Sequence, residues 1–435
     1  MRLFAHTASR MQIASVRLSL LCAVIACGSM SAFAEQPPSC RENAPVASVS
    51  YSGLSLTDPK VVTRELLNGT GRAFSAADYA VEKRRLEGLD LFSDIGLICT
   101  ERGDSLALEY RFKELFHWIP SPAGKKTDQD GWMLGLALAH LNVGGEDIRS
   151  EVQYRQSIHP WMDSKEYAFY NSSPWLLDYP VSWNVEFLRT DSWDDLRGYY
   201  DRSWYAHADL TGKLRGPLSL LWAASYRYLE GEGNIPDLGA GFVFDDRDSP
   251  VDSRNGAYEE IRLTRTGGFA DSPENYLEWL WDNRLYLETG RFVTHLSSLA
   301  RYRPGEQKFY DRLQQGGANS LRGFDPDSSV HGRHEILLNA EERFVLLPRT
   351  PFTVLGANLF WGVQLVAGAD GSFLWDKDGV PGWEDYRSAV YAGVHFIIPA
   401  LDRLRIEVGY SPDGDGPVIA VGLFEKDVSQ RWRSR

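Results

Sequence analysis

The sequence predicts a transmembrane antiparallel β-barrel of about sixteen strands, preceded by one small α+β domain with the element order β-α-α-β-β. Three observations favour this fold class. Between about residues 115 and 424, short segments alternate apolar and polar side chains and are separated by clusters of Gly, Pro, Asn and Asp. Many of the polar faces carry charges that could not line a dry core. The chain also includes 14 Trp and 20 Tyr but only 5 Met, and Trp and Tyr gather where apolar membrane meets water.

Residues 1–34 are predicted to be an export signal peptide. This stretch has arginines and no acidic residue, an apolar run at residues 18–27, and the small-residue cleavage site Ala32-Phe33-Ala34. An alternative stays open, because the residues before Cys27 resemble a lipoprotein motif that would lead to acylation of Cys27. No later apolar run reaches the roughly 18 residues that a transmembrane helix needs, so the mature chain is expected to cross a membrane only as a barrel.

Charge and cysteine content limit the partners and the compartment. The formal net charge is −13, and no block of like charges forms a basic surface, so we expect no nucleic-acid partner. Removal of the signal peptide would leave two cysteines, Cys40 and Cys99. In an oxidising compartment this even count favours a disulfide between them, and two unpaired buried thiols are the alternative.

Residues 45–114 are predicted to form the small domain. Alternation at residues 47–51 predicts a strand, and residues 58–67 are expected to form a helix. Ser75 is placed as the N-cap of a second helix. Two further strands end the domain, joined by the turn Arg102-Gly103-Asp104.

The barrel is assigned to residues 115–424, and each strand is justified by a run of alternating side chains. The run at residues 218–228 places Leu, Trp and Tyr on one face and mostly Ser, Ala and Arg on the other. A soluble sandwich would alternate too, but charged positions such as Glu278 and Asp282, opposite Trp279, favour a wet lumen. In chain order the strands are expected near residues 115, 132, 148, 165, 181, 203, 218, 239, 256, 277, 292, 334, 358, 387, 404 and 418.

The connections between these strands alternate in length. Compact connections, at residues 212–217, 289–291 and 399–403, take turns with longer polar ones, at residues 190–201, 230–239 and 375–386. The short turns are expected to face the periplasm and the long loops to face the exterior.

A glycine-rich loop precedes the twelfth predicted strand. Its sequence, Gly316-Gly317-Ala318-Asn319-Ser320-Leu321-Arg322-Gly323-Phe324, resembles the signature loop of the BamA/TamA superfamily, which includes barrel-assembly proteins and two-partner secretion transporters. The family usually has Val-Arg-Gly-Phe or Val-Arg-Gly-Tyr, so Leu321 departs from the pattern while Arg322, Gly323 and Phe324 match it. The loop also lies between the predicted eleventh and twelfth strands, where the family places it.

Three further stretches agree with this resemblance. Residues 339–344 resemble the family's twelfth strand, and residues 84–95 resemble the end of the second helix of a POTRA domain. Residues 242–256 resemble the family's mid-barrel turn motif, whose positions in this chain are Asp245, Arg247, Asp248, Pro250 and Gly256.

The resemblance implies an outer-membrane barrel with a single periplasmic POTRA domain and a signature loop that folds back into the lumen. Carried over to this chain, Arg322 pairs with Glu341 and with Asp370 on the inner wall. A guanidinium offers carboxylates a rigid fork, and a shielded lumen would strengthen the pair. An ordinary loop arginine is the alternative.

Other loop positions have roles implied by the same resemblance. Gly316, Gly317 and Gly323 are expected to supply positive φ angles and close approach in a narrow lumen. Phe324 would be an apolar anchor, or else an aromatic side chain in contact with the outer leaflet.

The last predicted strand, residues 418–424, resembles the family's C-terminal assembly signal. Gly422 and the aromatic Phe424 carry this likeness. Residues 425–435 follow as a tail that the usual pattern, which ends in Phe, does not have.

No catalytic constellation is found in the sequence, so the chain is not expected to be an enzyme. There is no Gly-x-Ser-x-Gly motif, no Cys-x-x-Cys pair and no phosphate loop. The segment His331-Gly332-Arg333-His334-Glu335 fits no zinc signature, and Asp413-Gly414-Asp415-Gly416 lacks the later ligands of a calcium loop. We therefore expect no metal and no cofactor.

The resemblance implies that the chain assembles or inserts outer-membrane proteins, or moves a polypeptide across the outer membrane. The POTRA domain would capture an unfolded or extended periplasmic client by edge-strand pairing. Outer-membrane lipid would surround the barrel, and periplasmic chaperones or accessory factors are further possible partners. Two alternatives stay open: a passive pore or structural surface barrel, and a barrel that exports lipid or one dedicated partner.

Overall fold

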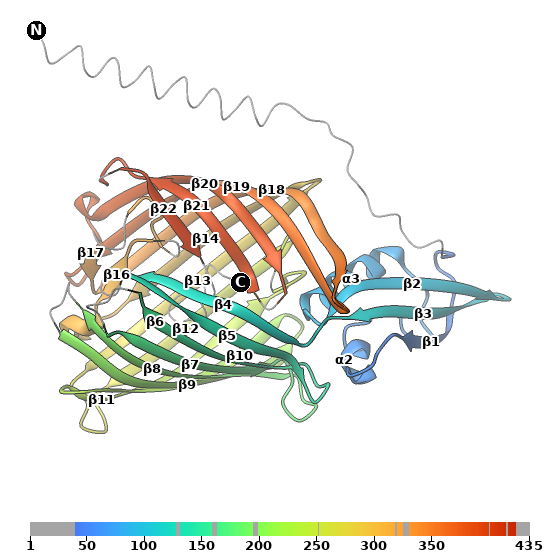
Figure 1. Cartoon of the computed structure of the whole chain (residues 1–435), viewed down its shortest axis with the longest axis horizontal. Coiled ribbons are helices and arrows are strands. Elements are labelled where there is room, and N and C mark those ends of the chain that lie inside the picture. The colour runs from blue at the N-terminus through green and yellow to red at the C-terminus, as the bar shows by residue number, and fades with distance from the viewer. Residues whose placement is uncertain are drawn as a thin grey trace, which may run out of the picture. The chain divides into compact units, whose positions relative to one another are not determined.

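The computed structural model describes residues 40–127, 131–158, 163–194, 199–250, 252–317, 320–324, 330–399, 401–414 and 416–422 (Figure 1). All of these described residues belong to one compact unit. The predicted signal peptide, Phe424 and the tail 425–435 lie outside the described residues. Within the described ranges, no helix is long and apolar enough to cross a membrane.

The N-terminal domain has the predicted element order and a three-stranded sheet. Strand β1 (Val46–Ser52) pairs in parallel with β3 (Ser105–Glu114), and β2 (Phe92–Arg102) pairs antiparallel with the other edge of β3. Helices α2 (Pro59–Thr63) and α3 (Ala76–Gly88) lie between β1 and β2 in the sequence. Because β3 is central, β1 and β2 each have one edge outside the sheet.

The first helix has five residues and is therefore shorter than the helix expected at residues 58–67. Asp58 is its N-cap and accepts a hydrogen bond from the N–H of Lys60 at 2.8 Å. Beyond Thr63 the chain leaves the helix, and the N–H groups of Leu67 and Asn68 donate to the buried carboxylate of Glu82 in α3. A tertiary acceptor therefore replaces the carbonyl groups that a longer helix would have supplied.

The disulfide predicted from the cysteine pair is present in this domain. Cys40 precedes β1 and Cys99 lies in β2, and their Cα atoms are 5.5 Å apart. The bridge closes a loop with a sequence separation of 59 residues, so it ties the entry of the domain to its edge strand β2.

Most of the rest of the described chain forms a closed antiparallel barrel, in which the long strands pair in sequence order and β22 lies next to β4. Of the strands in it, β15 is only two residues long. The predicted fold class is therefore confirmed. In chain order the barrel strands are β4 (Trp118–Thr127), β5 (Gly131–Val143), β6 (Ile148–Ser157), β7 (Lys165–Ser173), β8 (Val181–Asp194), β9 (Tyr199–Arg215), β10 (Leu218–Leu229), β11 (Gly233–Asp245), β12 (Gly256–Gly267), β13 (Asn275–Thr289), β14 (Phe292–Tyr302), β15 (Gly305–Glu306), β18 (His334–Val354), β19 (Ala357–Trp375), β20 (Tyr386–Ile398), β21 (Leu401–Tyr410) and β22 (Val418–Gly422).

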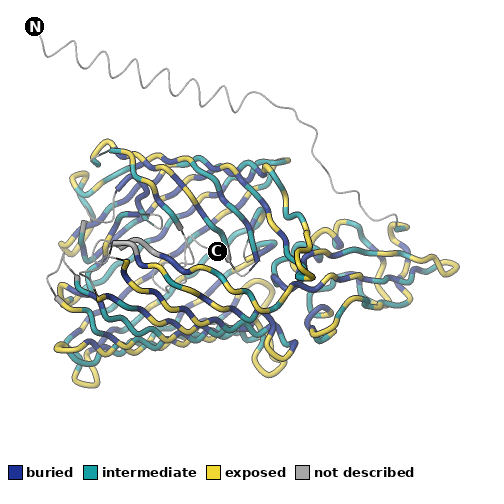
Figure 2. Tube along the Cα trace, in the orientation of Figure 1, coloured by how far each residue is buried: buried dark blue, intermediate teal, exposed yellow. Residues whose placement is uncertain are grey.

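Buried and exposed residues alternate along the barrel strands, as the colours of Figure 2 show. On β13, Glu278, Asp282 and Arg284 are buried, whereas Trp279 and Trp281 are each 52% exposed on the outer surface. A charged inner face and an apolar outer face reverse the pattern of a soluble domain and fit a barrel in lipid.

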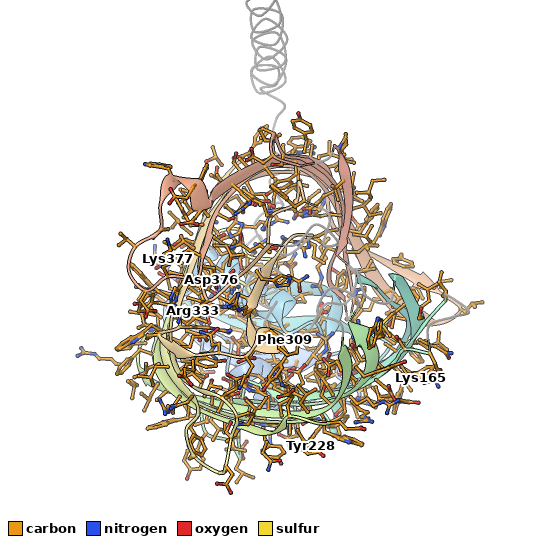
Figure 3. All side chains as sticks on the ribbon, turned by 90° about the vertical axis from the view of Figure 1, so that its left-hand side faces the viewer. Lys165, Tyr228, Phe309, Arg333, Asp376 and Lys377 are labelled. Carbon is orange, nitrogen blue, oxygen red and sulfur yellow. A yellow bond between two sulfur atoms is a disulfide. The ribbon has the colours of Figure 1, made fainter. Side chains whose placement is uncertain are left out.

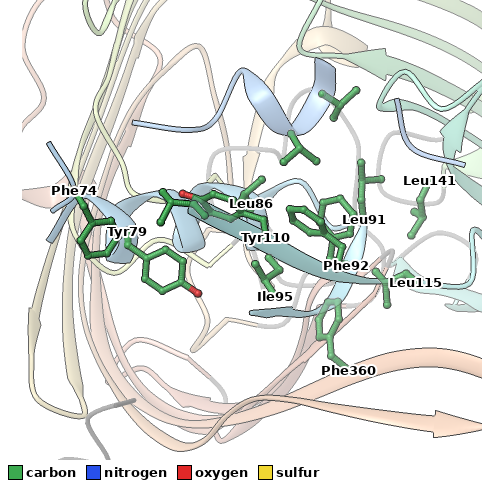
Figure 4. Close-up of a cluster of buried hydrophobic side chains, with 14 of the residues drawn as sticks. Phe74, Tyr79, Leu86, Leu91, Phe92, Ile95, Tyr110, Leu115, Leu141 and Phe360 are labelled. Atoms are coloured by element: carbon green, nitrogen blue, oxygen red, sulfur yellow. The ribbon is translucent and has the colours of Figure 1, made fainter. Parts of the chain in front are cut away.

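The core of the N-terminal domain continues into the base of the barrel (Figure 4). Phe74, Leu86 and Tyr110 are fully buried inside the domain. The same cluster includes Leu141 of β5 and Phe360 of β19. The domain and the barrel therefore share one apolar cluster.

We call the end of the barrel that carries the N-terminal domain the proximal end, and the opposite end the distal end. The proximal turns between β9 and β10 and between β13 and β14 are as short as expected. The proximal connection at residues 246–255 is longer and contains most of the predicted turn motif.

The distal end carries the connection between β14 and β18, residues 303–333, which includes a 3₁₀ helix (Phe309–Asp311) and a small sheet of β16 (Leu313–Gln315) and β17 (Val330–Gly332). Figure 3 looks onto this end and places Phe309 toward the middle of the barrel mouth. A second 3₁₀ helix (Trp383–Asp385) precedes β20.

Two distal connections differ from the sequence-based expectation. The long loop expected at residues 230–239 is wrong, because β11 already begins at Gly233, which pairs with Leu229. Asp237 in that segment accepts a hydrogen bond from Ser225 on the neighbouring strand, so its polar character reflects a lumen-facing position. Residues 190–201 are also largely strand, since Asp191 pairs with Arg202 across β8 and β9.

Candidate functional site in the barrel lumen

The glycine-rich loop folds into the lumen and buries its arginine. Arg322 is 1% exposed, and the adjacent Leu321 and Phe324 are buried with it. The loop reaches this position from the long distal connection between β14 and β18. A guanidinium with so little solvent requires compensating carboxylates and hydrogen bonds.

Both carboxylates that the resemblance assigns to Arg322 contact it. Asp370 on β19 holds the guanidinium in a two-pronged arrangement, with Nε to Oδ2 at 3.0 Å and Nη2 to Oδ1 at 3.1 Å. The backbone N–H of Arg322 also donates to Asp370 Oδ2, at 3.1 Å. Glu341 on β18 accepts from Nη1 at 3.2 Å. Two adjacent strands therefore fix the side chain and the backbone of one loop residue.

Two further partners of Arg322 were not found by sequence reasoning. Glu407 on β21 accepts from Nη1 at 2.8 Å, and the guanidinium carbon lies 3.3 Å from the ring centre of Tyr391 on β20. Both residues occupy lumen-facing positions of alternating strands, which is the signal that could have identified them. Four consecutive strands, β18 to β21, thus converge on Arg322.

Hydrogen bonds link the partners of Arg322 to one another. The Tyr391 hydroxyl donates to Glu341 Oε2 at 2.7 Å, and Asn339 Nδ2 donates to Asp370 Oδ1 at 2.9 Å and to the Tyr391 hydroxyl at 3.0 Å. Such a network fixes the positions of the carboxylates around the arginine. We call Arg322, Asn339, Glu341, Asp370, Tyr391 and Glu407 the lumen hub.

The charges around the lumen hub bear on metal binding. Ligand atoms of Glu341, His395 and Glu407 lie within 4.8 Å of one another, close enough to hold an ion. Arg322 Nη1 contacts both carboxylates of this group, and His395 Nε2 lies 2.8 Å from Glu407 Oε1. The guanidinium therefore supplies the positive charge that these carboxylates require, and we assign no metal to them.

Small residues make room for the loop. A Cβ atom on Gly409 would lie 1.8 Å from the carbonyl oxygen of Arg322, and one on Gly323 would lie 2.6 Å from the Ser411 backbone nitrogen. Gly316 and Gly317 have φ angles of +143° and +78°, as expected, but Gly323 has no positive φ. Close packing, and not backbone conformation, therefore explains Gly323.

Phe324 is an internal anchor. It is 6% exposed and packs in one cluster with Leu321 and Ala389 of β20. The alternative, in which Phe324 contacts the outer leaflet, is wrong because these neighbours lie on the lumen side. Leu321, the departure from the family pattern, fills the same cluster.

Comparisons with known proteins agree with this geometry. Residues 227–423 match the Omp85 superfamily domain, a range that contains the whole lumen hub. The barrel therefore carries an Omp85 superfamily domain. The resemblance noted in its motifs is confirmed at this level, and the chain is an outer-membrane protein. No match was found among curated proteins.

Solved structures are similar to this chain at low sequence identity. CdiB from Escherichia coli is 16% identical with a TM-score of 0.56, and the match covers 87% of this chain and 75% of that chain. CdiB from Acinetobacter baumannii is 15% identical with a TM-score of 0.50, covering 85% and 70%. BamA from Haemophilus ducreyi lacking POTRA domains 1–3 is 14% identical with a TM-score of 0.49, covering 87% and 83%.

The turn motif of the Omp85 domain lies apart from the lumen hub, at the proximal end. Arg247 donates from Nε and Nη2 to Asp245, at 2.7 and 2.8 Å. Asp248 accepts from Arg84 Nε of α3 at 3.0 Å. Gly256 has a φ of +102°, and Pro250 lies 3.2 Å from where a Cβ on Gly88 would stand. The motif therefore joins the barrel to the N-terminal domain.

A cavity of about 510 Å³ occupies the lumen between these two regions. Charged side chains of several strands line it, among them Asp209, Glu260, Arg262 and Asp282. Gly88, Leu89 and Asp90 of the N-terminal domain also line it. The interior of this Omp85 barrel is thus polar and is bordered on one side by the N-terminal domain.

The first strand of the barrel has a property that sequence reasoning missed. The N–H of Leu141 on β5 donates to the carbonyl of His117, at 3.0 Å, so the backbone groups of His117 face β5. Backbone groups of successive strand residues point in opposite directions. Pro120 and Pro122 therefore place their missing N–H groups on the side of β22, where the barrel closes.

The predicted assembly signal is described in part. Gly422 is the last residue of β22, which pairs with β21 from Arg405 to Gly409. Phe424 falls outside the described residues, so its predicted role stays a prediction.

Proposed function

We propose that this chain inserts outer-membrane proteins or moves a polypeptide across the outer membrane. In this proposal the N-terminal domain, residues 45–114, is a POTRA domain in the periplasm, and the barrel receives the client that this domain captures. The observation that carries the proposal is the lumen hub. In it, Arg322 of the superfamily's signature loop binds carboxylates on the inner wall of this barrel.

The free sheet edges of the N-terminal domain support client capture. In the order β1-β3-β2, each outer strand has one edge with no partner strand in this sheet. An extended polypeptide can add to such an edge through main-chain hydrogen bonds, which require no fixed client sequence. The disulfide from Cys40 to Cys99 braces β2, which makes this strand a defined template.

The closing seam of the barrel supports client handling. Strand β4 lacks two backbone donors toward its neighbour β22, because residues 120 and 122 are Pro120 and Pro122. Fewer interstrand hydrogen bonds lower the cost of separating two strands. We propose that this boundary is where a client strand meets the barrel wall.

We propose no catalytic chemistry and no cofactor for this chain. In the described residues the buried charged groups around Arg322 bond to one another as ion pairs and hydrogen bonds, which is an arrangement for holding a loop. Outer-membrane lipid and extended polypeptides are the proposed partners, with periplasmic chaperones or accessory factors joining at the N-terminal domain.

A passive pore is the second candidate function, and the charged cavity of about 510 Å³ favours it. A pore would conduct ions through the lumen without a client. Planar-bilayer conductance of the full-length protein, compared between wild type and Arg322→Ala, reports on this alternative.

A quantitative proteome comparison tests the main proposal. A deletion strain is complemented with wild type, with Arg322→Ala, or with Arg312→Ala, whose guanidinium forms an exposed ion pair with Asp376 at 3.3 Å. We expect loss of particular outer-membrane or secreted proteins in the deletion strain, rescue by wild type and Arg312→Ala, and no rescue by Arg322→Ala made at normal level. Unchanged proteomes in the deletion strain would contradict the proposal.

A further inference from the structure

The hairpin of β18 and β19 runs past its neighbours at the proximal end. Strand β14 pairs with β18 no further than Phe344, and β20 pairs with β19 only from Gly362 onward. The two strands nevertheless continue to pair with each other down to Val354 and Ala357. We call residues 346–361 the proximal hairpin.

The tip of the proximal hairpin is a tight two-residue turn. Leu355 and Gly356 have φ angles of +49° and +82°, the combination that a type I′ hairpin turn requires. Leu355 is fully exposed at this tip. A bulky apolar residue in a position that favours Gly or Asn is an unusual choice for a turn in water.

One face of the proximal hairpin holds the N-terminal domain. Arg349 Nη1 donates to the carbonyl of Glu87 at 2.8 Å, and the guanidinium carbon lies 3.4 Å from the ring centre of Phe360. On the same side, Asn358 Nδ2 donates to the carbonyl of Glu114 at 3.0 Å, and Thr353 accepts from Lys113 Nζ at 2.7 Å. This face is therefore occupied.

The opposite face is apolar and exposed. Cross-strand partners share a face, so the pairs of Phe352 with Leu359 and of Val354 with Ala357 lie together, away from the N-terminal domain. Phe352, Val354 and Trp361 are 39%, 47% and 44% exposed. Exposed contiguous apolar surface of this kind marks contact with a membrane or a protein.

Two observations favour lipid as the occupant of this face. Trp361 is followed along the same side of β19 by Leu365, which is exposed on the lipid-facing wall, so the hairpin face continues an existing lipid contact. Arg349 is the single charged residue in the sequence from 346 to 361, and it is turned toward the N-terminal domain. The other proximal connections named above carry charged residues or have one beside them, such as Arg215 and Arg291.

We propose that the proximal hairpin lays its outer face on the membrane leaflet at the proximal end, while its inner face holds the N-terminal domain. The occupant is phospholipid, which accepts the apolar side chains and the rings of Phe352 and Trp361 at its interface. The hairpin thereby ties the orientation of the N-terminal domain to the membrane surface. This surface is separate from the lumen hub and from the seam.

Site-specific fluorescence in liposomes tests this proposal. Leu355→Cys is made in the full-length mature protein, in which Cys40 and Cys99 are joined, labelled with an environment-sensitive dye and reconstituted in phosphatidylethanolamine and phosphatidylglycerol vesicles. Arg215→Cys, near the tip of the proximal turn between β9 and β10, is the matched control. We expect emission at shorter wavelength from position 355 than from position 215, and quenching by brominated phospholipids at position 355 alone.

A second variant keeps the test informative if labelling disturbs the tip. Phe352→Asp in the Leu355→Cys background should move the emission toward that of the control, because a charge on this face opposes lipid contact. Equal, water-like emission at positions 355 and 215 would overturn the proposal. A shielded label that brominated lipid does not quench, or a shift that grows with protein concentration, would also overturn it and would point to a second copy of the chain.

Discussion

At the residue scale, Arg322 has the environment of a structural arginine, because neighbouring carboxylates compensate its charge. Three carboxylates, one aromatic ring and a backbone contact surround a side chain with almost no exposure to water. Burial of this charge is expensive, and the carboxylates repay the cost only while the guanidinium stays in place. The loop is therefore held in the lumen by electrostatics and fitted there by the glycines.

Arg322→Ala should destabilise the folded barrel by about 3–5 kcal/mol, since it leaves buried carboxylates without their cation. Arg322→Lys should recover only part of this loss, because an ammonium cannot form the two-pronged contact with Asp370. Urea unfolding in detergent measures the difference. Arg312→Ala, at an exposed pair, should change stability by less than about 1 kcal/mol. Equal stability of Arg322→Ala and Arg312→Ala would show that the hub is not a structural element.

Glu114 makes a separate prediction about acid stability. Burial alone would raise the pKa of this carboxyl, but hydrogen bonds from Ser55 and from the Thr57 hydroxyl and N–H and the Leu56 N–H lower it to about 2. The folded-state pKa is therefore below the ordinary value, and its stabilising contribution is present above about pH 4.5 and is lost as the pH falls toward 2.

Hydrogen exchange of the segment around Leu56 and Thr57 measures this effect in the full-length protein. Wild type and Glu114→Gln are compared at each pH, so that the intrinsic pH dependence of exchange cancels. We expect wild type to be better protected at pH 6 and the two proteins to converge as the pH approaches 2. A constant difference across this range would contradict the assignment to Glu114.

At the scale of elements, the strands could be predicted from the sequence, while some wall partners of the lumen loop could not. Each predicted barrel segment corresponds to a strand because the alternation of side chains depends only on local spacing. Alternation marks Glu407 as lumen-facing, but many carboxylates share that property, and its contact with Arg322 depends on where the loop enters the lumen. The prediction of a loop near Asp237 was wrong for a related reason, since polar residues are found in a wet lumen as well as in loops.

The seam prolines lead to a prediction at this scale. Pro120→Ala with Pro122→Ala adds two N–H donors that face β22, so the seam should hold more hydrogen bonds and open less readily. We expect stronger hydrogen-exchange protection in residues 118–124 and, under the proposed function, slower delivery of clients. Pro217→Ala, in a proximal turn between β9 and β10, is the control. Unchanged protection at the seam would show that the prolines do not weaken it.

At the scale of the whole molecule, the N-terminal domain is joined to the barrel by more than its linker. Arg84 of α3 pairs with Asp248 of the turn motif at 2.9 Å, and Arg349 of β18 reaches the carbonyl of Glu87 at the end of α3. A cation at the carboxyl end of a helix interacts favourably with its exposed carbonyl groups. The shared apolar cluster that includes Leu141 and Phe360 adds a second kind of contact. The barrel base and the domain therefore form one interface that polar and apolar contacts both stabilise.

Arg349→Met should loosen this interface, because Met keeps the apolar contact with Phe360 but cannot donate to the carbonyl of Glu87. Distance distributions between spin labels, one in the N-terminal domain and one at a distal loop of the full-length protein, measure the change. We expect a broader distribution for Arg349→Met than for wild type, and a further broadening when Arg84→Ala is added, since the two arginines hold α3 independently. Lys113→Ala, which removes one exposed contact with Thr353, should leave the distribution close to that of wild type. If Arg349→Met also matched wild type, the apolar cluster alone would suffice to fix the domain, and the role given to the proximal hairpin in orienting it would pass to Phe360 and Leu141.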